Sequence, residues 1–280
     1  MGMTTRKAGL NDLEAMLKIE ASAIPGYGYL YENRHFYFDG VENRGEMVLA
    51  ELDGVPVGMG QYSVLPDGSG WLEILRVDKP HQRMGAGRAI YRRYLQLAEE
   101  TGAPSVAMFT GWKNAASRGL AEANGFHLAA AMAGYDKELS AGEVDEAVLN
   151  RFRVVSSPEE ARRRIDPKGW GPFMALNRTF FHYNDALAEY LCGRGMVYTD
   201  GENTVVVGCR MLKQRGYHIG WFGGDPEICL ALAEAVTRRE GLPKLTIMFP
   251  PERKDLAEIV AKDGYAASGE LIVMERVFAN

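Results

Sequence analysis

The chain has 280 residues, of which 46% are hydrophobic and 25% are charged, and these values are ordinary for a soluble globular protein of two domains. Its formal net charge of -5 is not the basic signature of a nucleic-acid-binding protein. No apolar run approaches the roughly 18 residues of a membrane-spanning helix, and residues 1–18 lack the apolar core of a signal peptide. We therefore expect a cytoplasmic protein with no nucleic-acid or membrane partner.

The three cysteines, Cys192, Cys209 and Cys229, are odd in number and far apart, and no C-x-x-C motif occurs. This spacing argues against a disulfide framework and against a zinc site. We expect reduced, buried thiols and no bound metal.

Turn and cap signals divide the first half into short elements. Residues 4–8 read as a strand, and Asn11 or Asp12 can cap the helix that follows. Residues 24–38 read as an aromatic-rich connection. The strands expected next are 47–52, 55–64, 71–77, 105–110 and 128–139, with helices from 87 to about 101 and from 114 to 123. A right-handed β-α-β crossover should join strands 71–77 and 105–110.

The second half repeats this pattern. A hairpin turns at Asp200-Gly201, residues 217–222 form a strand, Pro226 starts a helix, and strands at 245–249 and 271–278 flank a last helix. Asp263-Gly264-Tyr265 ends that helix as Asn124-Gly125-Phe126 ends its counterpart. We interpret the pattern as a duplicated domain; the alternative is a coincidence of common α/β elements. The expected domains are residues 1–140 and 151–280, joined by a linker at 141–150.

A glycine-rich loop follows strand 71–77 and opens a helix. Gly85 and Gly87 allow positive φ and a close approach of the backbone to a ligand. The loop amides and the helix N-terminus then point at one place, which predicts an anion site suited to a pyrophosphate. Arg83 and Arg88 can add charge-assisted contacts to phosphate.

Two common phosphate motifs do not fit this loop. A Walker A loop needs G-x-x-x-x-G-K-[ST], which is absent. The dinucleotide fingerprint needs a small residue where Ile90 stands, and it should open the first βαβ unit of the chain, which this loop does not.

The run Gln82-Arg83-Met84-Gly85-Ala86-Gly87 resembles the acetyl-CoA loop of the GNAT acetyltransferase superfamily, Q/R-x-x-G-x-G/A. Asn114, Ser117 and Leu120, followed by Gly125-Phe126, resemble the next helix of that family, N-x-x-[SA]-x-x-L…G-F. The strand order agrees over residues 3–139. The resemblance implies tandem GNAT-like domains of mixed α/β class. Each would be a mixed, mostly antiparallel sheet flanked by helices, with a central parallel β-α-β unit that binds CoA.

The same resemblance implies where acetyl-CoA, the acyl donor, would lie. Pantetheine would enter a V-shaped opening between strands 71–77 and 105–110 and pair with backbone near Leu75 and Val77. Asn114 and Ser117 would lie near it. The pyrophosphate would be held by the loop residues Gln82, Arg83, Met84, Gly85, Ala86, Gly87 and Arg88.

Transfer to an amine needs a base, because only the neutral amine attacks a thioester. Glu73 is the candidate, since similar family members carry a glutamate there and its neighbours Leu72 and Ile74 are apolar. The alternative is an acid exposed on the sheet face or paired with Arg76. A strand-edge N–H near Leu75 or Arg76 is the natural oxyanion donor.

The sequence departs from the family at the leaving-group acid. Many members carry a tyrosine where Ala121 stands. Tyr135 can substitute, although a core or edge tyrosine is the alternative interpretation, and water or no acid at all remains open.

The acceptor side is expected at residues 27–38, which hold Tyr27, Tyr29, Tyr31, Phe36, Tyr37 and Phe38 beside Glu32 and Asp39. Aromatic and acidic groups together can bind an amine; the alternative is that several only seal the core. The second half has Gly223-Gly224-Asp225-Pro226 in place of the phosphate loop, and Asp225 would repel a pyrophosphate. We expect that half not to bind CoA.

These features predict an acetyl-CoA-dependent N-acetyltransferase that acts on a small amine in a ternary complex, as a monomer or homodimer. Two alternatives stay open: an acetyl-CoA-binding sensor or scaffold without catalysis, and a protein lysine or N-terminal acetyltransferase.

Overall fold

The computed structural model of the chain describes residues 2–26, 28–38, 44–140 and 142–278. It divides into two compact units. The first unit comprises Met1–Met108, Asn114–His127 and Met274–Asn280, and the second comprises Phe109–Lys113 and Leu128–Val273. The assignment of residues 1–140 and 151–280 to two domains stays a prediction.

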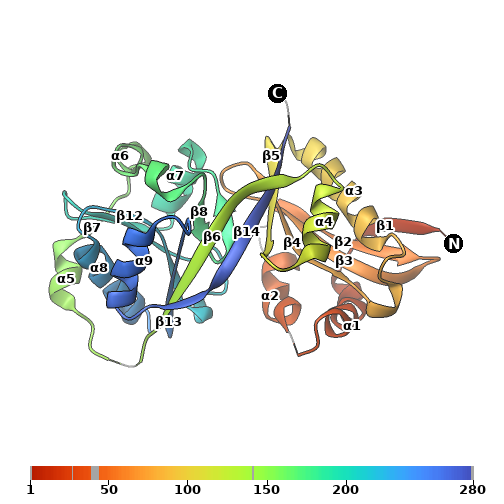
Figure 1. The fold of residues 1–280 in the computed structure, drawn as a ribbon, viewed down its shortest axis with the longest axis horizontal. Coiled ribbons are helices and arrows are strands. Elements are labelled where there is room, and N and C mark those ends of the chain that lie inside the picture. The colour runs from red at the N-terminus through yellow and green to blue at the C-terminus, as the bar shows by residue number, and fades with distance from the viewer. Residues whose placement is uncertain (1, 27, 39–43, 141, 279–280) are drawn as a thin grey trace. The chain divides into compact units, whose positions relative to one another are not determined.

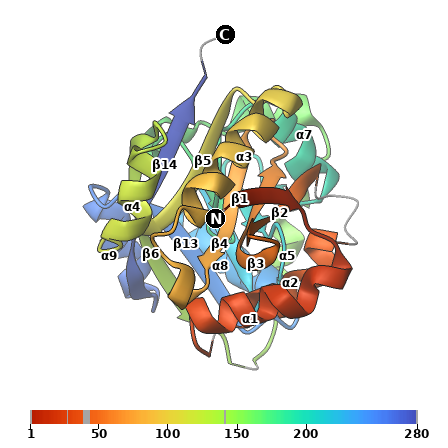
Figure 2. The same ribbon diagram turned by 90° about the vertical axis from the view of Figure 1, so that its right-hand side faces the viewer.

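The first unit is a sheet with helices on both faces (Figures 1 and 2). Its strands are β1 (Met3–Lys7), β2 (Arg44–Leu52), β3 (Val55–Val64), β4 (Gly70–Val77) and the start of β5 (Ser105–Gly111). Its helices are α1 (Leu13–Ala23), α2 (Tyr29–Phe38), α3 (Ala86–Thr101) and α4 (Ala115–Glu122), with short 3-10 turns at Leu10–Asp12 and Lys79–His81. The strand order is β1-β2-β3-β4-β5, antiparallel up to β4 and parallel between β4 and β5.

The two faces of this sheet carry different helices because successive strand residues point to opposite sides. Met47, Leu49 and Met59 pack in one hydrophobic cluster with residues of α1 and α2. Gly58 and Gly60 face α3; a Cβ on Gly60 would lie 1.8 Å from the Tyr94 hydroxyl. Figure 2 shows α1 and α2 together on one side of the strands.

The helix α2 corrects the sequence analysis, which expected only a connection over residues 24–38. Three side chains of α2 are buried, Leu30, Asn33 and Tyr37, at spacings of three and four residues. Exposed aromatic residues between them, such as Tyr31, hide the helical period in the sequence.

The second unit is also a mixed sheet with helices. Its strands are β6 (His127–Glu138) after its first residue, β7 (Arg153–Val154), β8 (Met174–Leu176), β9 (Thr179–Phe181), β10 (Val197–Thr199), β11 (Thr204–Gly208), β12 (Tyr217–Gly223), β13 (Lys244–Phe249) and β14 (Ala266–Val277) up to Val273. Its helices are α5 (Glu146–Arg151), α6 (Pro158–Arg164), α7 (Asp185–Gly193), α8 (Pro226–Arg239) and α9 (Lys254–Lys262), with 3-10 turns at Pro167–Trp170 and Lys213–Arg215. The strand order is β14-β6-β13-β12-β11-β10-β7, and β8 and β9 form a separate hairpin.

The order β12-α8-β13-α9 repeats β4-α3-β5-α4, with β12 parallel to β13 as β4 is to β5. The predicted mixed α/β class is confirmed. Two local features differ from expectation: residues 146–151, expected in a linker, form α5 with Leu149 buried, and residues 174–181 form a β-hairpin.

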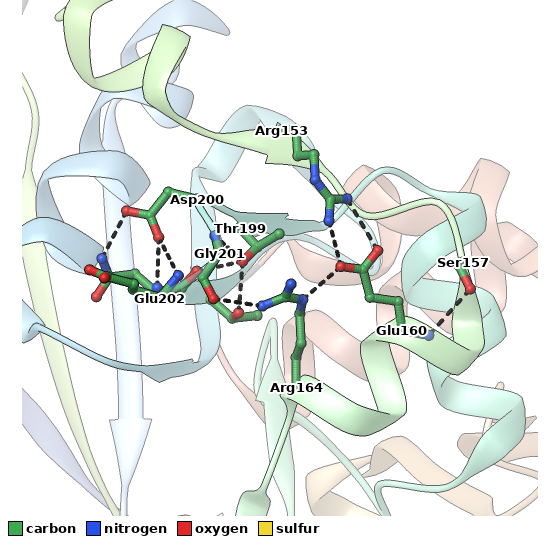
Figure 3. Close-up of polar contacts among 10 residues, drawn as sticks. Arg153, Ser157, Glu160, Arg164, Thr199, Asp200, Gly201 and Glu202 are labelled. Atoms are coloured by element: carbon green, nitrogen blue, oxygen red, sulfur yellow. Dashed lines mark hydrogen bonds and ion pairs between the residues drawn. The ribbon is translucent and has the colours of Figure 1, made fainter.

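Polar contacts fix α6 to the β10–β11 turn (Figure 3). The Glu160 carboxylate accepts hydrogen bonds from the guanidinium groups of Arg153 and Arg164. Arg164 also donates to the carbonyl of Gly201, 3.0 Å away. The three consecutive arginines of α6 each pair with an acid: Arg162 with Asp185, Arg163 with Glu159 and Arg164 with Glu160. No helix within the described ranges is long and apolar enough to cross a membrane.

Candidate active site

A β-bulge interrupts β4 next to the predicted base. Gln61 of β3 pairs with Glu73, but Met59 pairs with Arg76, so β4 has one extra residue between these pairs. Ile74 takes φ of 46° there, which is rare for a β-branched residue. The bulge re-aims the strand, and Ile74 joins the cluster under α1 and α2 while Glu73 contacts α2.

The pairing of β4 with β5 ends before this bulge. The parallel register joins Gly70 to Val106 and Trp71 to Ala107. Within the described chain, residues 72–77 of β4 have no partner in β5. The edge that the resemblance assigns to pantetheine, near Leu75 and Val77, is therefore not used by β5.

The loop after β4 has the geometry of an anion site. Gly85 is the N-cap of α3 with φ of 100°, and Arg83 takes φ of 64°. No side chain caps this helix, so its first amides have no partner inside the helix or from a cap. The loop from Gln82 to Gly85 is exposed, whereas Ala86 is buried and anchors the helix start.

Close packing holds the start of α3. A Cβ on Gly87 would lie 2.9 Å from a methyl group of Leu120 in α4, so only glycine fits without a shift. This contact places the first turn of α3 beside α4.

A polar network ties the loop to α1. The Asp78 carboxylate lies 2.7 Å from Nδ1 of His81, and the Lys79 amide donates to the Ser22 hydroxyl. Hydrogen bonds from Ser22 and then His81 hold the pKa of Asp78 below its ordinary value, so this acid stays ionised at neutral pH. The network fixes where β4 ends and the glycine-rich loop begins.

Glu73 is buried, with 9% of its surface exposed. The Ser63 hydroxyl donates to Oε1 at 2.9 Å, and the Tyr37 hydroxyl donates to Oε2 at 3.3 Å. These two contacts aim the carboxylate toward the α1 and α2 face. The sequence analysis did not identify Ser63 as a contact of Glu73. Residues 61, 63 and 73 share one face of the sheet, but this can be recognised only once the pairing register of β3 and β4 is known.

Asn114 and Ser117 lie together at the start of α4. Asn114 is the N-cap, and its Oδ1 accepts the Ser117 amide at 3.2 Å. This cap is a structural reason for the asparagine that does not depend on a ligand. The contact of both residues with pantetheine stays a prediction.

Tyr135 belongs to the second unit, whereas Glu73 and the loop belong to the first. Its ring stacks on Phe249 with centroids 5.1 Å apart. Its role as an acid stays a prediction. Ala121, at the departure from the family, is fully buried.

The aromatic residues expected on the acceptor side divide into two kinds. Tyr37 is buried and touches Glu73, while Tyr31 is 54% exposed beneath the guanidinium of Arg34. Tyr27 and Asp39 lie outside the described residues.

The equivalent helix start in the second unit is closed. Asp225 is the N-cap of α8, and its Oδ1 accepts the amides of Glu227 at 2.9 Å and Ile228 at 3.3 Å. Asn203 Oδ1 accepts the Asp225 amide. The amides at this helix start therefore have side-chain partners, unlike those at the start of α3.

Residues 13–126 match the family model of the acetyltransferase (GNAT) family. These residues, which make up less than half of the chain, are thus similar to the GNAT family. The match spans α1 to the end of α4 and therefore includes the bulge, the glycine loop and the capped helix start. It supports an acyltransferase. No curated protein sequence matches the chain.

Solved GNAT structures share the fold of the whole chain. A GCN5-related N-acetyltransferase from Sphaerobacter thermophilus matches with a TM-score of 0.63 and 12% identity, over 98% of this chain and 95% of that one. A tandem GNAT protein from the clavulanic acid biosynthesis pathway matches with a TM-score of 0.60 and 14% identity, over 100% and 99%. A candidate acetyltransferase from Pyrococcus horikoshii matches with a TM-score of 0.59 and 21% identity, over 100% of this chain and 90% of that one. At these identities the likeness shows the fold alone, and it includes a tandem GNAT architecture.

Proposed function

We propose that this protein is an acetyl-CoA-dependent N-acetyltransferase of the GNAT type that acetylates a small amine in a ternary complex, at one site per chain. The observation that carries this proposal is the uncapped start of α3 at Gly85, which follows the strand that bears Glu73 after one 3-10 turn and a short loop. A helix N-terminus without a side-chain cap, reached through a positive-φ glycine, fits a pyrophosphate.

In this proposal acetyl-CoA supplies the thioester, and the chain binds and orients it. The amides from Met84 to Arg88 hold the pyrophosphate, and the free edge of β4 near Leu75 and Val77 holds pantetheine. Asn114 and Ser117 lie beside it.

Glu73 accepts the proton of the acceptor amine, directly or through water, while Ser63 and Tyr37 hold its carboxylate in place. A strand-edge N–H at Leu75 or Arg76 stabilises the tetrahedral oxyanion. The leaving thiolate has a thiol-like pKa and needs only modest protonation, which water would supply.

The test is thiol release from acetyl-CoA by a panel of amines, with product confirmed by mass. The proposal expects turnover that depends on both substrates and a Glu73→Gln protein that binds acetyl-CoA but turns over slowly. Binding without turnover of any amine would contradict it.

A second candidate, a non-catalytic acetyl-CoA-binding protein, is favoured by one observation. Ala121 stands at the buried position where many family members carry the leaving-group tyrosine. The same thiol-release assay separates the two, because a sensor would bind acetyl-CoA and release no thiol.

A further inference from the structure

The contacts of Glu73 show from which side the acceptor must come. Glu73 contacts Tyr37 of α2, whereas Gly58 and Gly60 of the neighbouring strand face α3. The base therefore points to the face covered by α1 and α2, opposite the face on which α3 packs. An acceptor whose proton goes to Glu73 must reach it from this α2 face.

Asn33 carries an unused acceptor on that face. It lies one helical turn before Tyr37 in α2 and is 1% exposed. Its amide nitrogen donates to the Tyr29 carbonyl at 2.9 Å, but its Oδ1 has no hydrogen-bond partner among the described residues. A buried carbonyl without a partner costs free energy, and such groups are rare in folded proteins.

The charges around this face favour a cation. Glu20 of α1 is 1% exposed, and both of its carboxylate oxygens accept the Leu30 amide. Arg76 and Glu32 are the charged groups that act on it. Glu20 and Glu73 are thus two buried carboxylates, and each contacts α2.

Resting on the proposed function, we propose that the acceptor is a small amine with a second cationic nitrogen, and that Asn33 Oδ1 accepts an N–H bond from it. One nitrogen is acetylated beside Glu73 while the other is held by Asn33 and by the buried carboxylate of Glu20. Burial raises the pKa of Glu20, which is consistent with a carboxylate that gains from a nearby cation.

Three acceptors of matched length test this inference on the full chain: 1,4-diaminobutane, butylamine and 4-aminobutyrate. They differ at the far end, which is an ammonium, a methyl group or a carboxylate. We expect kcat/KM to be highest for 1,4-diaminobutane by about tenfold or more, the usual worth of a hydrogen bond to a charged group. The carboxylate compound should be the poorest.

Variants of Asn33 then test the residue. Asn33→Leu keeps the size but removes Oδ1, and should raise KM for 1,4-diaminobutane to the value for butylamine with the Kd of acetyl-CoA unchanged. Asn33→Asp keeps an acceptor oxygen and should retain the preference. Asn11→Leu, in the exposed 3-10 turn before α1, is the control and should change neither value.

Equal kcat/KM for the three acceptors in the wild-type protein would overturn this inference and leave the proposed function standing. So would an Asn33→Leu protein that keeps the full diamine preference. Failure of every amine to release thiol from bound acetyl-CoA would instead overturn the proposed function, and with it the inference.

Discussion

The two units present the same structural feature, a helix that follows a strand, with opposite chemistry at its first turn. Helix α3 begins at Gly85 with a left-handed backbone and no side-chain cap. Helix α8 begins at Asp225, whose carboxylate accepts the amides of residues 227 and 228. The start of α3 can accept an external anion, whereas the start of α8 is already occupied by the carboxylate of Asp225.

The strands before these helices differ in the same way. β12 has a register shift at Gly220, as β4 has at Ile74. The residue before the shift is Glu73 in β4 and Ile219 in β12, so the second strand lacks the buried carboxylate. In the proposed function, binding and chemistry therefore belong to the first unit alone.

The largest expected effect comes from closing the open helix start. Gly85→Asp places a carboxylate beside the bare amides, where it would cap the helix and repel a pyrophosphate. We expect acetyl-CoA affinity to fall by about a hundredfold or more, measured by calorimetric titration.

Gly102→Asp is the matched control for that change. Gly102 is a left-handed glycine at the other end of α3, with no atom near a Cβ, as for Gly85. It should leave acetyl-CoA affinity unchanged. Equal losses in both variants would mean that helix stability, not the anion site, is being measured.

Glu73→Gln tests whether the buried carboxylate of β4, which β12 lacks, acts as the base. It keeps the shape of the side chain and removes the base, so kcat should fall by about a hundredfold or more, the usual worth of general base catalysis. Steady-state kinetics and donor titration measure this, and the Kd of acetyl-CoA should stay the same. Unimpaired kcat would exclude Glu73 as the base.

Removing one donor to this carboxylate should have a smaller effect. Tyr37→Phe keeps the ring in the core but loses the hydrogen bond to Oε2, so we expect kcat to fall by about tenfold or less. Tyr94→Phe is the control, because its buried hydroxyl has no hydrogen-bond partner among the described residues. A larger loss in the control would contradict this assignment.

Opening the closed helix start should change stability only. Asp225→Ala removes the cap of α8 and should lower the free energy of unfolding by about 0.5–2 kcal/mol, measured with urea. It should create no second binding site, since Asn203 still occupies the Asp225 amide. A second mole of bound acetyl-CoA would show that the cap alone closes this unit.

The sequence predicted the elements that its turn and cap residues delimit. Pro226 and Asp225 mark the start of α8, and Gly85 marks that of α3, because each has a local backbone requirement. The helix α2 was missed because exposed aromatic residues mask its period. The bulge at Ile74 was missed because a β-branched residue gives no local sign of positive φ.

The site was predictable where one segment supplies it and not where several do. The loop residues from Gln82 to Arg88 are contiguous, so their spacing alone indicates a phosphate site. The contacts of Glu73 with Ser63 and Tyr37 depend on strand register and on the packing of α2. The cap formed by Asn114 shows that a family position can also have a structural reason.

Calorimetric titration of acetyl-CoA into the wild-type chain tests the central claim most directly. The account predicts one ligand per chain, and a binding signal that Gly85→Asp removes and Asp225→Ala leaves unchanged. Two ligands per chain, or binding that survives Gly85→Asp, would contradict the division of roles between the two helix starts.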